Sequence, residues 1–151
     1  MGSSFVNIAG KGFWIRDGIL ELWLRLLALH IEEPTDAEAP ACKIRDRWLL
    51  ASRGYFNGCV PVHLDDAVST AEGRALVVAA IESLMHAVKK APAKLDRHTL
   101  NLLGFERGVF THDPDSEQLI EIGEAFLALI AGEIHSDATS REFMPGSQPA
   151  T

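Results

Sequence analysis

The chain has 151 residues, of which 47% are hydrophobic and 23% charged. This size and composition are typical of one globular domain and unlike those of a disordered or fibrous protein. The formal net charge is −7, which argues against nucleic acid or an anionic membrane as the main partner, because both attract basic surfaces.

The negative charge is confined to the last third of the chain. Residues 1–105 hold twelve acids and twelve bases, whereas residues 106–151 hold nine acids and two bases and so carry the whole charge of −7. The two cysteines, Cys42 and Cys59, match no zinc or redox motif and fit a reducing compartment. Because no signal peptide or membrane span is recognisable, we expect a cytoplasmic protein.

The first half of the chain predicts two helices after an irregular start. Residues 1–16 show no period-two alternation, and we expect them to be irregular. The first helix is predicted over 18–32, in a stretch that is apolar except for one narrow stripe, so it is expected at the centre of the fold. The stripe consists of Glu21, Arg25, Ala28 and Glu32. The second helix is predicted over 40–53, with Pro40 in its first turn.

The second half predicts a helical turn over 62–68 and a long helix from a capping box at Ser69 to Lys90. A short helix is expected over 97–103 and a last one over 114–131. Together these elements predict an all-α, single-domain helical bundle of about five helices, with little or no sheet. The domain is expected to span residues 1–135, and residues 136–151 are expected to form a loose tail.

Two acidic clusters have metal-ligating residue types, but each has a simpler explanation. His63, Asp65 and Asp66 share one loop, where carboxylates commonly cap turns. The run 112–117 (HDPDSE) lacks the glycine and the glutamate of a calcium loop, and acids favour the start of a helix. Since no catalytic motif is present either, we predict no catalytic residue, no metal site and no cofactor.

His30 falls on the apolar side of the first predicted helix, beside Trp23 and Leu27. A histidine in that position is expected to be buried, and it then needs a hydrogen-bond partner. Two interpretations stay open. His30 is a core residue satisfied by a backbone carbonyl, or it is a ligand-binding or catalytic imidazole in an internal cavity.

The remaining features favour contact with another protein. Glutamates of the last helix lie close together on one side of it, as the helical period places them, and a surface of one sign attracts partners of the other sign. Aromatic residues in irregular segments are candidate interface anchors, although they can instead close the ends of a bundle. The partner-binding candidates are Glu117, Glu121, Glu124, Tyr55, Phe56 and Trp14.

Three segments resemble a family of short, uncharacterised bacterial all-helical proteins. They are FWIRDGILELWLRLLALHI (13–31), WLLASRGYFNGCVP (48–61) and IEIGEAFLALIAGEI (120–134). The resemblance implies a cytoplasmic bacterial protein, and some acidic proteins of this kind are similar to immunity proteins, which neutralise a toxin partner.

The sequence therefore predicts a non-enzymatic acidic protein-binding module, with an immunity-type protein that neutralises a basic toxin as its specific form. The alternative is a small helical enzyme or ligand-binding protein with an internal cavity near His30. A third hypothesis is a self-associating protein with Leu50 or Trp14 at a homodimer contact.

Overall fold

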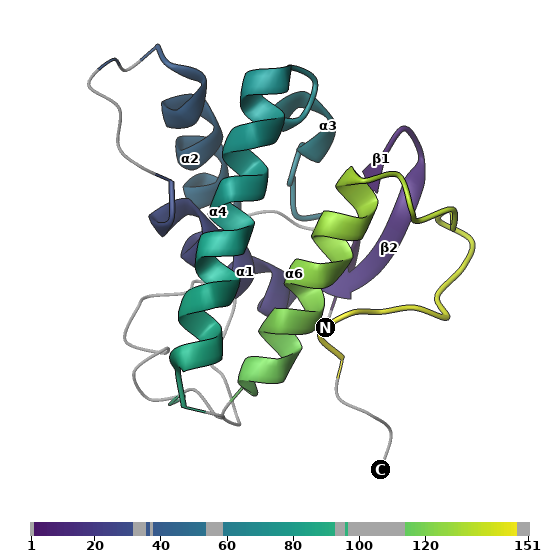
Figure 1. Cartoon of the computed structure of the whole chain (residues 1–151). Coiled ribbons are helices and arrows are strands. Elements are labelled where there is room, and N and C mark those ends of the chain that lie inside the picture. Colours follow the sequence, from purple (N-terminus) through teal and green to yellow (C-terminus); the bar gives the residue numbers. More distant parts are fainter. Residues whose placement is uncertain are drawn as a thin grey trace.

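Five helices and one β-hairpin make up the described part of this computed structural model, which covers residues 2–31, 36, 38–53, 59–92, 96 and 114–147 (Figure 1). In chain order the elements are β1 (Ser3–Ile8), β2 (Lys11–Arg16), α1 (Asp17–Leu29), α2 (Pro40–Ala51), α3 (Leu64–Ala67), α4 (Ala71–Lys90) and α6 (Ser116–Ile130). The protein is thus a mostly helical single domain, as the composition and periodicity predicted, and it also contains one small two-stranded sheet.

The helix positions follow the sequence prediction closely, and the differences lie at the ends. α4 begins after Thr70 instead of Ser69, because the Thr70 hydroxyl accepts a hydrogen bond from the backbone N–H of Gly73. α6 begins after Asp115, two residues later than the predicted start at Pro114. The predicted helix over 97–103 lies outside the described residues.

The prediction of an irregular segment over residues 1–16 was wrong, because these residues form an antiparallel hairpin. Its two-residue turn consists of Ala9 and Gly10, both at positive φ (52° and 82°), as a type I′ turn requires. The usual asparagine is missing from the turn, and the outward-facing Phe5 and Trp14 are apolar, so neither of the common hairpin signals is present.

Phe126 of α6 joins the hairpin to the central helix. Its ring centroid lies 5.7 Å from that of Phe13 on β2 and 5.7 Å from that of Trp23 on α1, and all three side chains are buried. Gly123, one turn earlier, permits this approach, since a Cβ there would lie 2.6 Å from the Met85 side chain of α4. The largest side chains of the core therefore meet where α1, α4, α6 and the hairpin converge.

The polar stripe predicted on α1 is largely covered, with Arg25 half-buried and Glu32 outside the described residues. Glu21 is 1% exposed and Ala28 is fully buried, because α2 packs along this side of the helix. The prediction that α1 is central is confirmed, and its coverage is more complete than expected (Figure 1). Leu29, at the end of the helix, is the exception, with 71% of its surface exposed.

The segment after α6, which was expected to form a loose tail, contacts both the hairpin and α6. The backbone N–H of Gly12 donates to the Ser136 carbonyl at 2.8 Å, and the ring of Phe143 lies 6.1 Å from that of Phe13. Further on, Gln118 of α6 donates to the Gly146 carbonyl through Nε2 while its Oε1 accepts from the Asp115 backbone. In Figure 1 this segment, in yellow, runs beside β2 before it turns back toward α6.

The position of Phe126 leads to a first prediction. Replacement of Phe126 by alanine should lower the free energy of unfolding by about 3–5 kcal/mol, since it leaves a cavity between Phe13 and Trp23. Urea denaturation measures the loss, and Leu50→Ala, at a position that is 51% exposed, should change stability by less than about 0.5 kcal/mol. A loss below about 1 kcal/mol for Phe126→Ala would mean that the core does not depend on this contact.

Candidate protein-binding site

The three glutamates predicted to share one face of the last helix lie on an exposed surface of α6. Glu117, Glu121 and Glu124 are all exposed, and their spacing places them one helical turn apart. The opposite side of α6 carries the core residues Ile122 and Phe126. No ion pair joins these glutamates to a basic side chain within the described residues. We call the surface formed by Glu117, Glu121 and Glu124 the α6 acidic face.

His30 is only half-buried, so the expectation of a buried histidine was wrong. α1 ends at Leu29, and His30 is the residue that follows its last turn. The predicted helix ran on to residue 32, and the helical geometry that placed His30 on the apolar side therefore does not apply to it. Its Nδ1 lies 2.8 Å from the hydroxyl oxygen of Ser83 on α4, an interaction that satisfies one ring nitrogen.

Trp14 is half-buried and is covered by the segment that follows α6. Its indole Nε1 donates to the Ala138 carbonyl at 2.9 Å, and the guanidinium of Arg141 lies 3.9 Å from the ring centroid. The ring also contacts Phe5 of β1, with 5.5 Å between the centroids. The chain thus uses Trp14 for an internal contact, whereas Tyr55 and Phe56 lie outside the described residues.

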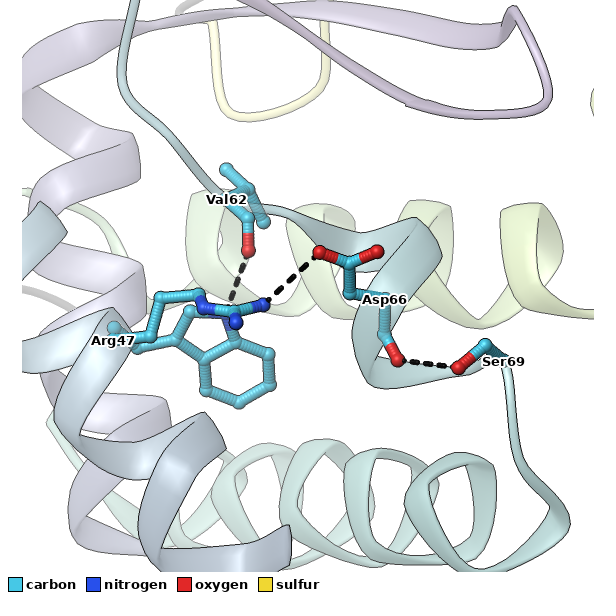
Figure 2. A network of polar contacts seen from close by, with 5 residues as sticks. Arg47, Val62, Asp66 and Ser69 are labelled. Carbon is cyan, nitrogen blue, oxygen red and sulfur yellow. Dashed lines mark hydrogen bonds and ion pairs between the residues drawn. The ribbon is translucent and has the colours of Figure 1, made fainter.

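The acids of the loop around α3 hold this loop in place. As Figure 2 shows, Arg47 of α2 pairs with Asp66 at 3.4 Å, and the Asp66 carbonyl accepts from the Ser69 hydroxyl. The indole of Trp48 donates to the Val62 carbonyl at 3.0 Å. Asp65 accepts instead from the backbone N–H of Ala9 in the hairpin turn. The carboxylates of Asp65 and Asp66 therefore serve separate contacts, and no group of metal-ligating residues forms within the described part of the chain.

One polar cluster, at the contact between α1 and α2, was not predicted from the sequence. Ser52, which is fully buried at the end of α2, accepts a hydrogen bond from Arg25 Nε at 3.2 Å and donates to the Leu49 carbonyl. Burial lowers the pKa of Arg25, the nearby charge of Arg53 lowers it further, and the charge of Glu21 opposes both effects. Arg25, a residue of the predicted polar stripe, thus joins α1 to the end of α2. The signal in the sequence was the position of Glu21 and Arg25 within an otherwise apolar helix.

The contact between Trp14 and Arg141 leads to a second prediction. Arg141→Ala should remove a cation–π interaction of about 0.5–1 kcal/mol and loosen the segment against the hairpin. Amide hydrogen exchange of Gly12, which donates to Ser136, should become faster, whereas Arg141→Lys should retain part of the protection because it keeps the positive charge. Unchanged exchange at Gly12 in Arg141→Ala would show that the ring contact does not hold the segment.

Asp137 gives a third prediction. Its pKa is lowered first by the hydrogen bond from the Thr139 hydroxyl and then by the bond from the Thr139 backbone N–H. Thr139→Ala should raise the pKa of Asp137 toward its ordinary value in an NMR titration of the carboxyl. Because the folded pKa is the lower one, the stabilisation is present above the unfolded value and is lost as the pH falls through the folded value. An unchanged titration of Asp137 in the variant would contradict this cause.

No described helix is long and apolar enough to cross a membrane. No family model matches the chain, and searches of curated proteins and of solved structures found no match.

Proposed function

We propose that this chain is a non-enzymatic protein-binding module whose α6 acidic face recognises a basic partner protein. The observation that carries the proposal is the exposure of Glu117, Glu121 and Glu124 on one side of α6. These residues belong to the stretch 106–151, which holds the entire net charge of −7. A surface of one sign steers a partner of the opposite sign and raises its association rate.

The glutamates have no evident role in stabilising the fold. Like charges one turn apart on a helix destabilise it by a few tenths of a kcal/mol, which is about as much as a pair of opposite charges stabilises it. Only Glu117, in the first turn of α6, gains from the helix dipole. The α6 acidic face therefore lowers stability slightly and remains exposed on a well-packed helix. Both properties are consistent with a binding role.

The resemblance of three segments to short bacterial helical proteins suggests what the partner is. In its specific form, the proposal is that this chain is an immunity-type protein that binds and neutralises a basic toxin domain in the cytoplasm. A domain of this kind that acts on nucleic acid presents a basic surface to its substrate, and an acidic protein that covers that surface blocks access to the substrate.

The proposal is tested by charge reversal. A variant with Glu117→Lys, Glu121→Lys and Glu124→Lys changes the net charge by two units per site, from −7 to −1. Wild-type and variant proteins serve as baits for pull-down from the source cell, and association with the captured basic partner is then measured at low and high salt. We expect slower association of the variant, with the larger difference at low salt because salt screens the interaction. The melting temperature should stay almost unchanged.

A matched control separates a local effect from one of net charge. Asp46, Glu72 and Glu82 are exposed acids outside the last third of the chain, and their reversal to lysine produces the same net charge of −1. If this control slows association as much as reversal of the α6 acidic face does, net charge alone acts and the face is not a binding site. Equal capture by the wild type and the α6 variant also contradicts the proposal.

A further inference from the structure

One edge of the hairpin has backbone groups that no other described part of the chain pairs. In an antiparallel ladder, residues alternate between pairs that bond to each other and pairs whose N–H and C=O groups point outward. Gly12 donates outward to Ser136, so its partner Asn7 also points outward, on the other side of the hairpin. The alternation places Phe5 in the same class as Asn7. Within the described part of the chain, the backbone groups of Phe5 and Asn7 have no hydrogen-bond partner outside the hairpin.

A cleft of about 350 Å³ runs along this edge, between residues 5–7 of β1 and residues 59–66. This volume lies within the range of about 300–1,000 Å³ that binding clefts occupy. The two walls are joined near both ends of the edge. The Val60 N–H donates to the Ser4 hydroxyl at 2.8 Å, and the Ala9 N–H donates to Asp65 at 3.2 Å.

Between these two links the cleft separates residues 61–64 from β1. The Val62 N–H bonds to the Val60 carbonyl within its own segment, at 3.0 Å, and so does not pair with β1. The Trp48 indole and the Arg47 side chain hold this wall from behind through Val62 and Asp66 (Figure 2). The cleft is therefore bounded by a strand edge with unpaired backbone groups and by a wall that α2 keeps in place.

We propose that the β1 edge binds an extended peptide segment of a partner protein, which adds to the hairpin as a third strand and places a lysine or arginine beside Asp65. Strand addition uses the backbone groups of the edge for affinity and the walls of the groove for specificity. The described lining of the cleft contains two carboxylates, Asp65 and Asp66, and neither lysine nor arginine. Arg47 pairs with Asp66, and the exposed Asp65 carries the charge that selects a basic side chain.

The two edges of the hairpin differ, which supports this inference. Exposed strand edges promote unwanted pairing, and proteins usually cover them. The β2 edge is covered by the segment after α6 through the bond from Gly12 to Ser136. The β1 edge is bordered by a cleft instead. The cleft shares no residue with the α6 acidic face, so the inference does not depend on the proposed function.

The test uses an array of random ten-residue peptides probed with the wild-type chain. We expect the selected peptides to contain a lysine or arginine within a sequence that is rich in β-branched residues and alternates apolar with polar residues. Asn7→Pro removes the outward N–H without breaking a bond between β1 and β2, and it should weaken binding at least tenfold. The matched control Asn7→Ala loses the same side-chain contact to Gly10 but keeps the N–H, and it should bind like the wild type.

A second measurement leaves the protein unchanged, in case proline disturbs the hairpin. Each selected peptide is made in two forms, with N-methyl groups on odd or on even residues. Because alternate residues of a strand face the edge, one form should lose binding and the other should keep it. Asp65→Asn keeps an oxygen that can accept from the Ala9 N–H. It should weaken binding of the basic peptides several-fold and leave binding of versions without lysine or arginine unchanged.

The inference is overturned if Asn7→Pro, folded as judged by circular dichroism, binds every selected peptide as tightly as the wild type. It is also overturned if both N-methylated forms bind equally, or if the array yields no peptide that depends on the outward N–H. Peptides that are lost on reversal of Glu117, Glu121 and Glu124 but not in Asn7→Pro would bind the α6 acidic face, and they would count against the β1 edge as the peptide site.

Discussion

The contact of Phe126 with Phe13 and Trp23 holds together parts of the fold that local structure would leave apart. A two-stranded hairpin is marginally stable in water, so β1 and β2 need a larger surface to pack on. Phe126 provides it by bringing α6 against β2 and α1 at once, with centroid distances of 5.7 Å on both sides. The absence of a side chain at Gly123 lets Met85 and Trp23 come close enough for this arrangement. Both candidate surfaces depend on it, because it positions α6 and supports the hairpin.

The segment after α6 completes the hairpin on one side only. It covers the outward face of β2 through the carbonyls of Ser136 and Ala138 and through the guanidinium of Arg141. On the other side, the loop around α3 touches β1 near its two ends and leaves the middle of the edge open. The hairpin is thus protected where the chain returns to it and accessible where a cleft forms.

α6 has two roles on its two sides. Its apolar side supplies Phe126 and Ile122 to the core, while its outer side presents Glu117, Glu121 and Glu124 to solvent. Helical periodicity alone separates these two sets of residues. For that reason both the core stripe and the acidic face were predictable from the sequence. In the structure the core stripe is buried and the acidic face is exposed, as predicted. The same reasoning failed for His30, because the helix that was expected to orient it ends at Leu29, one residue before His30.

The sequence by itself determined the helical class, the approximate bounds of α1, α2, α4 and α6, and the location of the negative charge, since periodicity and composition are local properties. Only the tertiary structure decided that residues 3–16 pair as a hairpin, that Glu21 is buried beside α2 and that Trp14 is covered by Ala138 and Arg141. Each of these features depends on a segment distant in the sequence that supplies the missing partner. The burial of a residue is set by what packs on it, and a local pattern does not contain that information.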